Sequence, residues 1–417
     1  MEILVIGNGG REHAIIWKLL KDGYKNLYCI PGNAGISQLA KCIDMKINDF
    51  KAIADFCVYN SIDFVIVGPD NPLADGIVDF LKSRGIKTFG PSKMASEIES
   101  SKVFSKNLMK KYLIPTASYE CFNNSSNAIQ YTKNKNRYPI VIKADGLALG
   151  KGVYIAYNED EAICAINEIM VDKKFGESGS KIVIEEYLEG FETSFFIISD
   201  GKNIVPLTTA KDYKKAFDQD KGPNTGGMGS YSPNNMVDKK TYEYILENIM
   251  EKTVYAMNKE GRPFVGVLYG GLILTQDGPK VLEFNARFGD PETQAIMPLI
   301  NSDLLEIMIK AYEGNLKSID IDISSKNSLC LVLASNGYPD KYETGYKIEG
   351  MEYLSDDVIL YHANTKFDEN KNIITAGGRV LNICAIGESL SLAREKVYSQ
   401  VTKIKYDNIY YRKDIGI

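Results

Sequence analysis

The sequence predicts a multidomain protein of the α/β and α+β classes, with a parallel α/β domain at its N-terminus. The chain has 417 residues, enough for about two to four domains of roughly 100–200 residues each. Over the first hundred residues, short apolar runs alternate with helical patterns, which indicates β-α-β units and a parallel sheet. From about residue 117, strand-rich and mixed stretches follow one another, so further cores are expected.

Each strand of the first domain is a short apolar run followed by turn residues. The strands are expected at 3–7, 26–30, 63–68 and 87–90. Apolar residues at helical spacing predict a helix from Glu12 to Leu20. Ligands bind at the carboxyl ends of the strands in such sheets.

The later elements are expected as follows. One helix runs from residue 92 to just before Pro115, and residues 117–190 are strand-rich with polar loops at 132–137 and 175–181. A helix from Ser302 to Tyr312 precedes a linker at 313–327. The remainder contains strands at 328–334 and 378–387 and a helix at 389–404.

Composition excludes several classes of function. With 54 acidic and 49 basic residues, the net charge of −5 leaves no basic surplus for nucleic-acid backbones. No signal peptide and no membrane-spanning run is found, so a cytoplasmic protein that binds neither nucleic acid nor membrane is expected. Seven dispersed cysteines indicate reduced thiols, and two histidines disfavour a histidine metal site or a Ser-His-Asp triad.

Residues 7–13 read GNGGREH, directly after the first strand. Gly7 and Gly9 fit the dinucleotide fingerprint G-x-G-x-x-G, but Glu12 stands where the third glycine belongs and no carboxylate follows the second strand. Arg11 at a helix N-terminus suits a phosphate monoester instead. The alternative is a strand–helix turn that binds no ligand.

Residues 141–156, VIKADGLALGKGVYIA, predict a glycine-rich flap between two antiparallel strands. The segment is not a Walker A motif, because no Ser or Thr follows Lys151 and the next residues are strand-like. The flap's N–H groups can fold over a triphosphate, and Lys143 on the incoming strand can reach the phosphates. The alternative is an ordinary exposed hairpin.

Two strand ends carry carboxylates. In 182–197 the segment from Glu185 to Leu188 can border a purine, and Glu192 can bind ribose hydroxyls, although surface glutamates are usually solvated. In 280–294, KVLEFNARFGDPETQ, strand alternation places Glu283 and Asn285 on one face, with Leu282 and Phe284 on the other. These oxygen ligands suit Mg²⁺, and Arg287 can bind a carboxylate or transition-state charge.

Residues 211–233, KDYKKAFDQDKGPNTGGMGSYSP, are too polar and glycine-rich for the interior of an element. We expect a long loop that either positions a small substrate or is a flexible connection.

Six stretches occur in order: GNGGREHA, PGNAG, VIKADGLALGKGV, IEEYLEG, GPNTGGMGSYSP and EFNARFGDPETQ. On these the chain resembles the glycinamide ribonucleotide synthetase (phosphoribosylamine–glycine ligase) family of ATP-grasp enzymes. The resemblance extends to YHANTK and AGGRVL near the C-terminus. It implies an N-terminal α/β domain at 1–101, an ATP-grasp core at 102–316 with a mobile lid at about 117–190, and a small mixed α/β domain at 317–417.

The activity implied by the resemblance is ligation of glycine to 5-phosphoribosylamine in purine biosynthesis. ATP phosphorylates the glycine carboxylate, and the amine attacks the glycyl phosphate, giving glycinamide ribonucleotide, ADP and phosphate. The implied cofactors are ATP and Mg²⁺, which Mn²⁺ can replace, and a monomer is expected.

The resemblance also implies roles for individual residues. The implied ATP-binding residues are Lys102, Lys143, Gly146, Gly150, Gly152, Glu185, Leu188 and Glu192. The implied metal ligands are Glu283 and Asn285, and Arg287 is the implied catalytic residue, facing the glycine carboxylate or its acyl phosphate. The implied substrate-binding residues are Gly9, Gly10, Arg11, Asp70, Asp212 and Arg287.

Two positions depart from the family pattern. Asn364 stands where the family usually has glycine, and Tyr213 stands where histidine is expected. Three competing functions remain: another ATP-grasp ligase or carboxylase-like enzyme, a nicotinamide-dependent dehydrogenase, and a non-catalytic nucleotide-binding module. RFGDPETQ disfavours the first, the missing third glycine disfavours the second, and the combination of Glu283, Asn285 and Arg287 disfavours the third.

Overall fold

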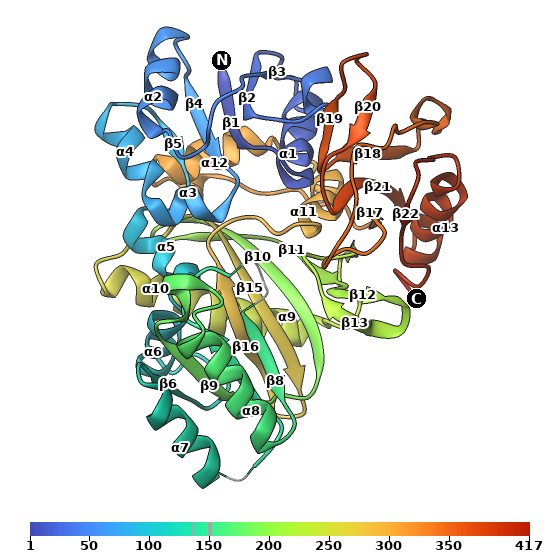
Figure 1. Ribbon diagram of the computed structural model, residues 1–417. Coiled ribbons are helices and arrows are strands. Elements are labelled where there is room, and N and C mark those ends of the chain that lie inside the picture. Colours follow the sequence, from blue (N-terminus) through green and yellow to red (C-terminus); the bar gives the residue numbers. More distant parts are fainter. Residues whose placement is uncertain (136, 149–151) are drawn as a thin grey trace.

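The computed structural model describes residues 1–135, 137–148 and 152–417 (Figure 1). The N-terminal α/β domain lies at one end of the molecule, and a separate four-stranded unit lies at the other (Figure 1). A long sheet connects these parts to the C-terminal region. No helix within the described ranges is long and apolar enough to cross a membrane.

The first domain is the predicted parallel sheet, in the order β3-β2-β1-β4-β5. Its strands are β1 (Ile3–Gly7), β2 (Leu27–Pro31), β3 (Lys41–Cys42), β4 (Phe64–Val67) and β5 (Thr88–Phe89). The chain leaves β1 toward β2 on one side and returns to β4 on the other. The carboxyl ends of β1 and β4 therefore form the crevice where sheets of this type bind ligands.

Helices cover both faces of this sheet. One face packs on α2 (Phe50–Tyr59), α3 (Asp70–Asp75) and α4 (Ile77–Ser83). The other packs on α1 (Gly10–Lys21) and on α12 (Leu304–Tyr312), which comes from far along the chain. A helix of the later sequence thus completes the core of the first domain.

The helix predicted between residue 92 and Pro115 is wrong as a single element. The structure has α5 (Lys93–Ser100) and α6 (Lys102–Lys111), separated at Ser101. Ser101 has an extended backbone, and its hydroxyl accepts a hydrogen bond from the Phe104 N–H at 3.1 Å. The serine is an N-cap, so it ends one helix and starts the next.

The four-stranded unit contains the predicted antiparallel hairpin of β7 (Ile140–Ala144) and β8 (Val153–Ala156). Its strand order is β6-β9-β7-β8, with β6 at Tyr119–Phe122 and β9 at Ile182–Glu186. Helices α7 (Ser125–Lys135) and α8 (Glu159–Ile166) pack on it. The polar loop expected at 132–137 is wrong over 132–135, because α7 continues through those residues.

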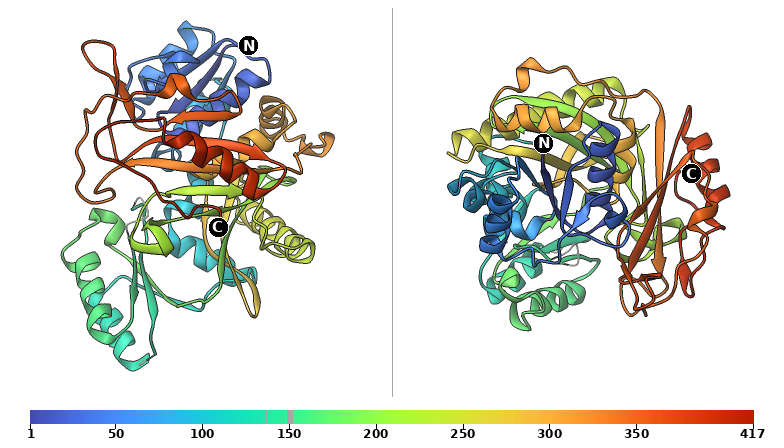
Figure 2. Two further views of the ribbon diagram at one scale, coloured as in Figure 1. Left: turned by 90° about the vertical axis from the view of Figure 1, so that its right-hand side faces the viewer. Right: turned by 90° about the horizontal axis from the view of Figure 1, so that it is seen from above.

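A nine-stranded sheet forms the centre of the molecule and runs continuously into the C-terminal region (Figures 1 and 2). Its order is β16 (Gly278–Asn285), β15 (Val265–Thr275), β10 (Phe191–Asp200), β11 (Ile204–Asp212), β14 (Gly229–Ser232), β17 (Asn327–Ser335), β21 (Arg379–Gly387) and β18 (Val358–His362), with β22 (Ile409–Tyr410) pairing β17. The remaining helices are α9 (Lys239–Ile245), α10 (Lys252–Lys259), α11 (Glu292–Ile296) and α13 (Leu390–Val401).

The segment 211–233 is not the long loop that its composition predicts. It contains the hairpin of β12 (Lys215–Phe217) and β13 (Lys221–Asn224), and then β14. Strand β14 pairs with β11 on one side and β17 on the other. Through β14, this polar segment therefore connects the strands of the central sheet to those of the C-terminal region.

The expected linker at 313–327 also packs. Ile319, Ile321 and Ile323 lie against the core cluster that α1 and α12 share, and the Asn301 N–H donates to the Asp322 carbonyl at 2.9 Å. In the C-terminal region, β19 (Thr365–Phe367) and β20 (Ile373–Thr375) form a small hairpin beside the sheet.

Candidate active site

The GNGGREH turn is built around the carboxylate of Glu12. The Gly9 N–H donates to Glu12 Oε2 at 2.7 Å, which caps α1. A Cβ at Gly7 would lie 2.4 Å from Glu12 Cγ, and one at Gly68 would lie 2.1 Å from Glu12 Oε1. The glycines after β1 and β4 therefore make room for Glu12, and the Gly9 N–H already has a partner within the protein.

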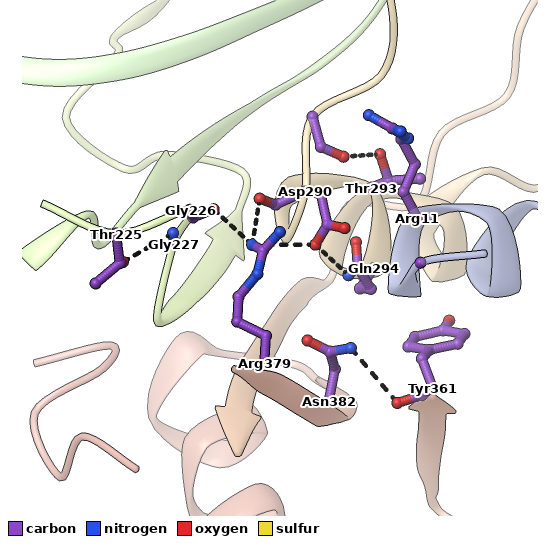
Figure 3. Close-up of polar contacts among 12 residues, drawn as sticks. Arg11, Thr225, Gly226, Gly227, Asp290, Thr293, Gln294, Tyr361, Arg379 and Asn382 are labelled. Carbon is purple, nitrogen blue, oxygen red and sulfur yellow. Dashed lines mark hydrogen bonds and ion pairs between the residues drawn. The ribbon is translucent and has the colours of Figure 1, made fainter. Parts of the chain in front are cut away.

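Arg11 lies beside the turn that follows β16. Its Nε contacts Glu12 Oε1 at 2.6 Å, and its Nη1 donates to the Phe288 carbonyl at 3.2 Å. Figure 3 shows Arg11 near Asp290 and Thr293. Gly10 is buried, because a Cβ there would lie 2.5 Å from the amide nitrogens of Gln294 and Asn382.

The PGNAG segment connects the first domain to the C-terminal region. The Asn33 amide nitrogen donates to the carbonyls of Asn8, His362 and Ala363 at 2.8, 3.0 and 3.1 Å. Its amide oxygen accepts from the N–H groups of Gly35 and Ile36, both at 2.9 Å. These contacts give Asn33 a structural role.

The two histidines meet at the same interface. The rings of His13 and His362 stack at 5.6 Å, and His13 Nδ1 accepts the His362 N–H at 2.9 Å. Burial lowers the pKa of His13 to about 3 and that of His362 to about 4. Both imidazoles are therefore neutral near pH 7.

Two lysines share one carboxylate below the flap. Lys143 on β7 and Lys106 on α6 each lie 3.1 Å from Glu185 Oε2, and all three side chains are buried. Lys106 also donates to the Thr116 hydroxyl at 2.7 Å, and burial lowers its pKa to about 8. One carboxylate between two ammonium groups leaves a positive environment that suits an anion.

The base of the flap is fixed to the start of α6. Asp145 Oδ1 accepts hydrogen bonds from the Val103 N–H at 2.8 Å and the Ser101 hydroxyl at 3.1 Å. Lys102 Nζ lies 3.4 Å from the carbonyl of Gly146, and the Gly152 carbonyl accepts from the Ala144 N–H at 2.9 Å. Gly150, implied as an ATP-binding residue, lies outside the described residues.

Near the start of β10, Glu192 is exposed and forms an ion pair with Lys214 at 3.0 Å. This pair raises the pKa of Lys214 well above its ordinary value. Leu188 is half-buried just after β9. These residues and Glu185 surround the end of β9 and the start of β10.

The expected metal ligands lie at the end of β16. Glu283 is opposite Gly271 and Asn285 is opposite Tyr269 on β15. A Cβ at Gly271 would lie 3.4 Å from Glu283 Cγ, so Gly271 packs beside the Glu283 side chain. Burial alone would raise the pKa of Glu283, but the surrounding cations, Lys214 foremost, lower it.

The alternation predicted for this strand holds only in part. A register shift places Leu282 in a bulge, so Val281 and Phe284 are the residues that enter the hydrophobic core.

A carboxylate and an amide oxygen fit Mg²⁺, which keeps waters and phosphate oxygens as its other ligands. Across the described part of the chain, no group of three or more His, Cys, Asp or Glu side chains is placed to hold a metal.

Arg287 lies beyond the end of β16 and connects three segments. Its Nη2 lies 2.8 Å from Glu99 Oε1 and 3.9 Å from Asp70 Oδ2, and it donates to Asn285 Oδ1 at 3.2 Å. Burial raises the pKa of Glu99, although Arg287 opposes this shift. The structure thus brings Asp70 at the end of β4 next to the metal-ligand candidates.

Asp212 lies in a buried acidic group. Its Oδ1 has no hydrogen-bond partner among the described residues, and burial together with the nearby Glu292 raises its pKa well above the ordinary value. The Ser194 hydroxyl donates to Glu292 Oε1 at 3.2 Å and lies 2.9 Å from the Tyr269 hydroxyl. A buried carboxylate with a free oxygen suits a cationic or hydrogen-bond-donating ligand.

The structure explains both departures from the family pattern. Tyr213 packs in the C-terminal core, and its hydroxyl accepts the Gly416 N–H at 3.1 Å. Asn364 donates through its amide nitrogen to the Arg379 carbonyl at 2.9 Å. Among the described residues, neither side chain forms a hydrogen bond with an implied phosphate or metal ligand.

Sequence reasoning missed five charged residues of this region: Glu99, Lys106, Lys214, Glu292 and Arg379. Glu99 and Lys106 occur in ordinary amphipathic helices, so no local signal marks them. Glu292 lies within the RFGDPETQ motif and Arg379 within AGGRVL, so those motifs are the signals that could have indicated them.

Three family descriptions match consecutive parts of the chain. They are the N domain of phosphoribosylglycinamide synthetase at residues 1–99, its ATP-grasp (A) domain at 100–293 and its C domain at 328–417. The chain belongs to the phosphoribosylglycinamide synthetase family. Its ATP-grasp domain implies the use of ATP.

Relatives of this family match over the full length. A phosphoribosylamine–glycine ligase of Caldanaerobacter subterraneus is 49% identical over 417 residues, covering 100% of this chain and 99% of the relative. One from Halalkalibacterium halodurans is 45% identical, covering 100% of this chain and 96% of that protein.

Two solved structures share the fold of this chain over nearly its whole length. The phosphoribosylamine–glycine ligase of Thermotoga maritima has a TM-score of 0.86 at 33% identity, with 100% of both chains covered. A biotin carboxylase domain from Hydrogenobacter thermophilus has a TM-score of 0.76 at 16% identity, covering 98% of this chain and 91% of that one, which shows a common fold alone.

Proposed function

We propose that this chain ligates glycine to 5-phosphoribosylamine with ATP, through a glycyl phosphate, giving glycinamide ribonucleotide, ADP and phosphate. The observation that carries the proposal is the meeting of Arg287 with Asp70, Glu99 and Asn285, which brings the crevice of the first domain to the end of β16. Family membership over the whole chain supports it.

The ATP phosphates occupy the region below the flap. Lys143 and Lys106, which share Glu185, provide the positive charge, and Lys102 approaches from the start of α6. The glycines Gly146 and Gly152 allow the flap to approach the phosphates closely. Glu185 and Leu188 border the adenine, and Glu192 binds the ribose.

Glu283 and Asn285 would hold Mg²⁺, or Mn²⁺ in its place. A divalent cation held there would supply positive charge next to the transferred phosphoryl group. The lowered pKa of Glu283 keeps its carboxylate ionised.

Arg287 binds the glycine carboxylate and then its acyl phosphate. Its pairing with Glu99 fixes the guanidinium in place, and a fixed cation costs no reorganisation during reaction. The amine nitrogen attacks the acyl carbon, the bond from that carbon to the phosphate oxygen breaks, and phosphate leaves with the proton that the amine loses. Because acyl phosphates are water-labile, exclusion of water by the flap protects the intermediate.

The 5-phosphoribosylamine lies in the crevice at β1 and β4. Gly9, Gly10, Arg11 and Asp70 form its walls, and Asp212 faces the region where its amine meets glycine. The capping of the Gly9 N–H by Glu12 makes the Arg11 guanidinium the main anion-binding group of this turn.

Domain boundaries at 101/102 and 316/317 are also part of the proposal, with a lid at about 117–190. The change of direction at Ser101 supports the first boundary. A monomer is also part of the proposal. Sedimentation equilibrium with and without substrates tests the oligomeric state.

The deciding experiment measures ADP release with ATP, Mg²⁺, glycine and 5-phosphoribosylamine generated in the assay, omitting each component in turn. We expect release to require both glycine and the amine, with glycinamide ribonucleotide as product. Release that does not require glycine would retain ATP use and overturn the substrate assignment. Release that requires bicarbonate would support the carboxylase-like alternative.

A further inference from the structure

The AGGRVL segment, residues 376–381, has no role in the mechanism above, but the side chain of its Arg379 reaches the proposed substrate site. Arg379 is the first residue of β21 in the C-terminal region, and its side chain points toward the turn that precedes α11 (Figure 3). Its Nη1 donates to the carbonyls of Gly226 at 2.5 Å and Asp290 at 2.7 Å, and it lies 3.3 Å from Asp290 Oδ1. One guanidinium therefore connects two segments that are 64 residues apart.

Gly378, the residue before Arg379, allows Tyr338 to pack beside this segment. A Cβ at Gly378 would lie 2.1 Å from Tyr338 Cδ2, so the ring of Tyr338 packs directly on that glycine. The Tyr338 hydroxyl in turn accepts the Gly226 N–H at 3.0 Å. The C-terminal region thus binds both the N–H and the carbonyl of Gly226.

The segment that Arg379 holds is next to the buried carboxylates. Gly227 has a φ of +111°, and a Cβ there would lie 2.7 Å from Asp212 Oδ1 and 2.3 Å from Pro291 Cδ. The Gly227 backbone therefore fits between Asp212 and the turn that leads into Glu292. A shift of this backbone changes the space in front of the free oxygen of Asp212.

The second segment reaches the first domain. Asp290 Oδ2 lies 3.4 Å from the Cβ position of Gly9, at the GNGGREH turn. Arg379 and Arg11 lower the pKa of Asp290 against the effect of burial. Asp290 is therefore held between the C-terminal region and the crevice of the first domain.

We propose that Arg379 is a positioning residue for the amine and glycine half of the site, because it fixes the Gly226–Gly227 backbone and Asp290 relative to each other. The ATP half is formed by α6, β7, β9 and β16. Among the described residues, Arg379 forms no hydrogen bond or ion pair with these elements. This inference rests on the proposed function. The C-terminal region would then position groups of the substrate site, in addition to adding strands to the central sheet.

The test measures steady-state kinetics of Arg379→Ala and Arg379→Lys, varying each substrate separately. We expect Arg379→Ala to lower kcat/KM for 5-phosphoribosylamine by about 100-fold, the effect of a misplacement of about 1 Å. The KM for ATP stays at the wild-type value. Arg379→Lys retains the charge but lacks the planar group that reaches both carbonyls, so its defect is intermediate.

Arg394→Ala is the matched control. Arg394 also lies in the C-terminal region and also donates to two carbonyls, those of Ile415 at 3.1 Å and Lys413 at 2.7 Å, but it does not reach the site. We expect its kinetics to equal those of the wild type. Added guanidinium ion should partly restore Arg379→Ala, whereas added ammonium should not.

A KM for ATP that rises as much as the KM for 5-phosphoribosylamine in Arg379→Ala would overturn the inference, as would wild-type kinetics for that variant. If Arg379→Ala does not fold, the Arg379→Lys profile decides by the same criterion. Absence of amine-dependent ADP release in the wild type would instead overturn the proposed function itself.

Discussion

Gly68 lies directly against the carboxylate of Glu12: a Cβ at Gly68 would be 2.1 Å from Glu12 Oε1. Gly68 follows β4 and Glu12 lies in the first turn of α1, so the two strand ends of the crevice are fitted to each other through one side chain. The glycine is required by this close approach, because Gly68 does not have a positive φ.

We therefore expect Gly68→Ala to lower the free energy of unfolding by about 1–3 kcal/mol, the range for overpacking. In a Glu12→Ala background the same change should cost less, because the colliding carboxylate is gone. Urea unfolding of the four proteins of this cycle measures the coupling. Equal costs in both backgrounds would show that Glu12 is not the obstacle.

Glu185 is the shared partner of two buried lysines. Glu185→Gln leaves Lys106 and Lys143 without a countercharge, so we expect the free energy of unfolding to fall by about 3–5 kcal/mol. Denaturant unfolding at pH 7 measures the loss. Glu260→Gln, which breaks a pair with the exposed Lys111, is the control and should change stability little. A similar small change in Glu185→Gln would contradict the shared-carboxylate description.

The stacked histidines predict a pH dependence of stability. The pKa of His13 is about 3 and that of His362 about 4 in the folded protein, both below the unfolded value near 6.5. The unfolded state therefore binds more protons below pH 6.5, and the stability present above that pH is lost as the pH falls toward 4. Each histidine contributes a slope of up to about 1.4 kcal/mol per pH unit.

Unfolding free energies measured between pH 7 and pH 5 check this slope. His13→Asn, which keeps an acceptor for the His362 N–H, should make the dependence less steep. An unchanged slope in that variant would show that His13 already carries a proton in the folded protein.

Glu283 is the carboxylate of the proposed metal site. Glu283→Ala should lower kcat by at least about 100-fold, the effect of removing one transition-state contact, while leaving the thermal unfolding midpoint close to that of the wild type. Mg²⁺-dependent ADP release and a thermal unfolding scan measure the two effects. Glu260→Ala removes a carboxylate that pairs with Lys111 away from the proposed site, so it serves as the control for activity. A Glu283→Ala protein with normal activity would place the metal elsewhere.

Much of the fold could be predicted because it depends on local patterns. Apolar runs followed by glycine turns gave the parallel sheet, and the glycine flap between β7 and β8 follows from residues adjacent in sequence. The nine-stranded sheet could not be predicted, because pairing of β14 with β17 joins segments about a hundred residues apart. The polar 211–233 segment gives no strand pattern, since its strands are short and are completed by partners.

The sequence by itself determined the family, the order of the glycine-rich turns and the presence of a carboxylate and an amide close together on β16, because each of these depends on contiguous residues. Only the tertiary structure decided which charges meet. It placed Glu99 against Arg287, Lys106 beside Lys143, and Arg379 of the C-terminal region against Asp290. Such pairings depend on how distant elements pack. A buried charge is costly unless an opposite charge lies close to it in space, and that partner can come from any part of the chain.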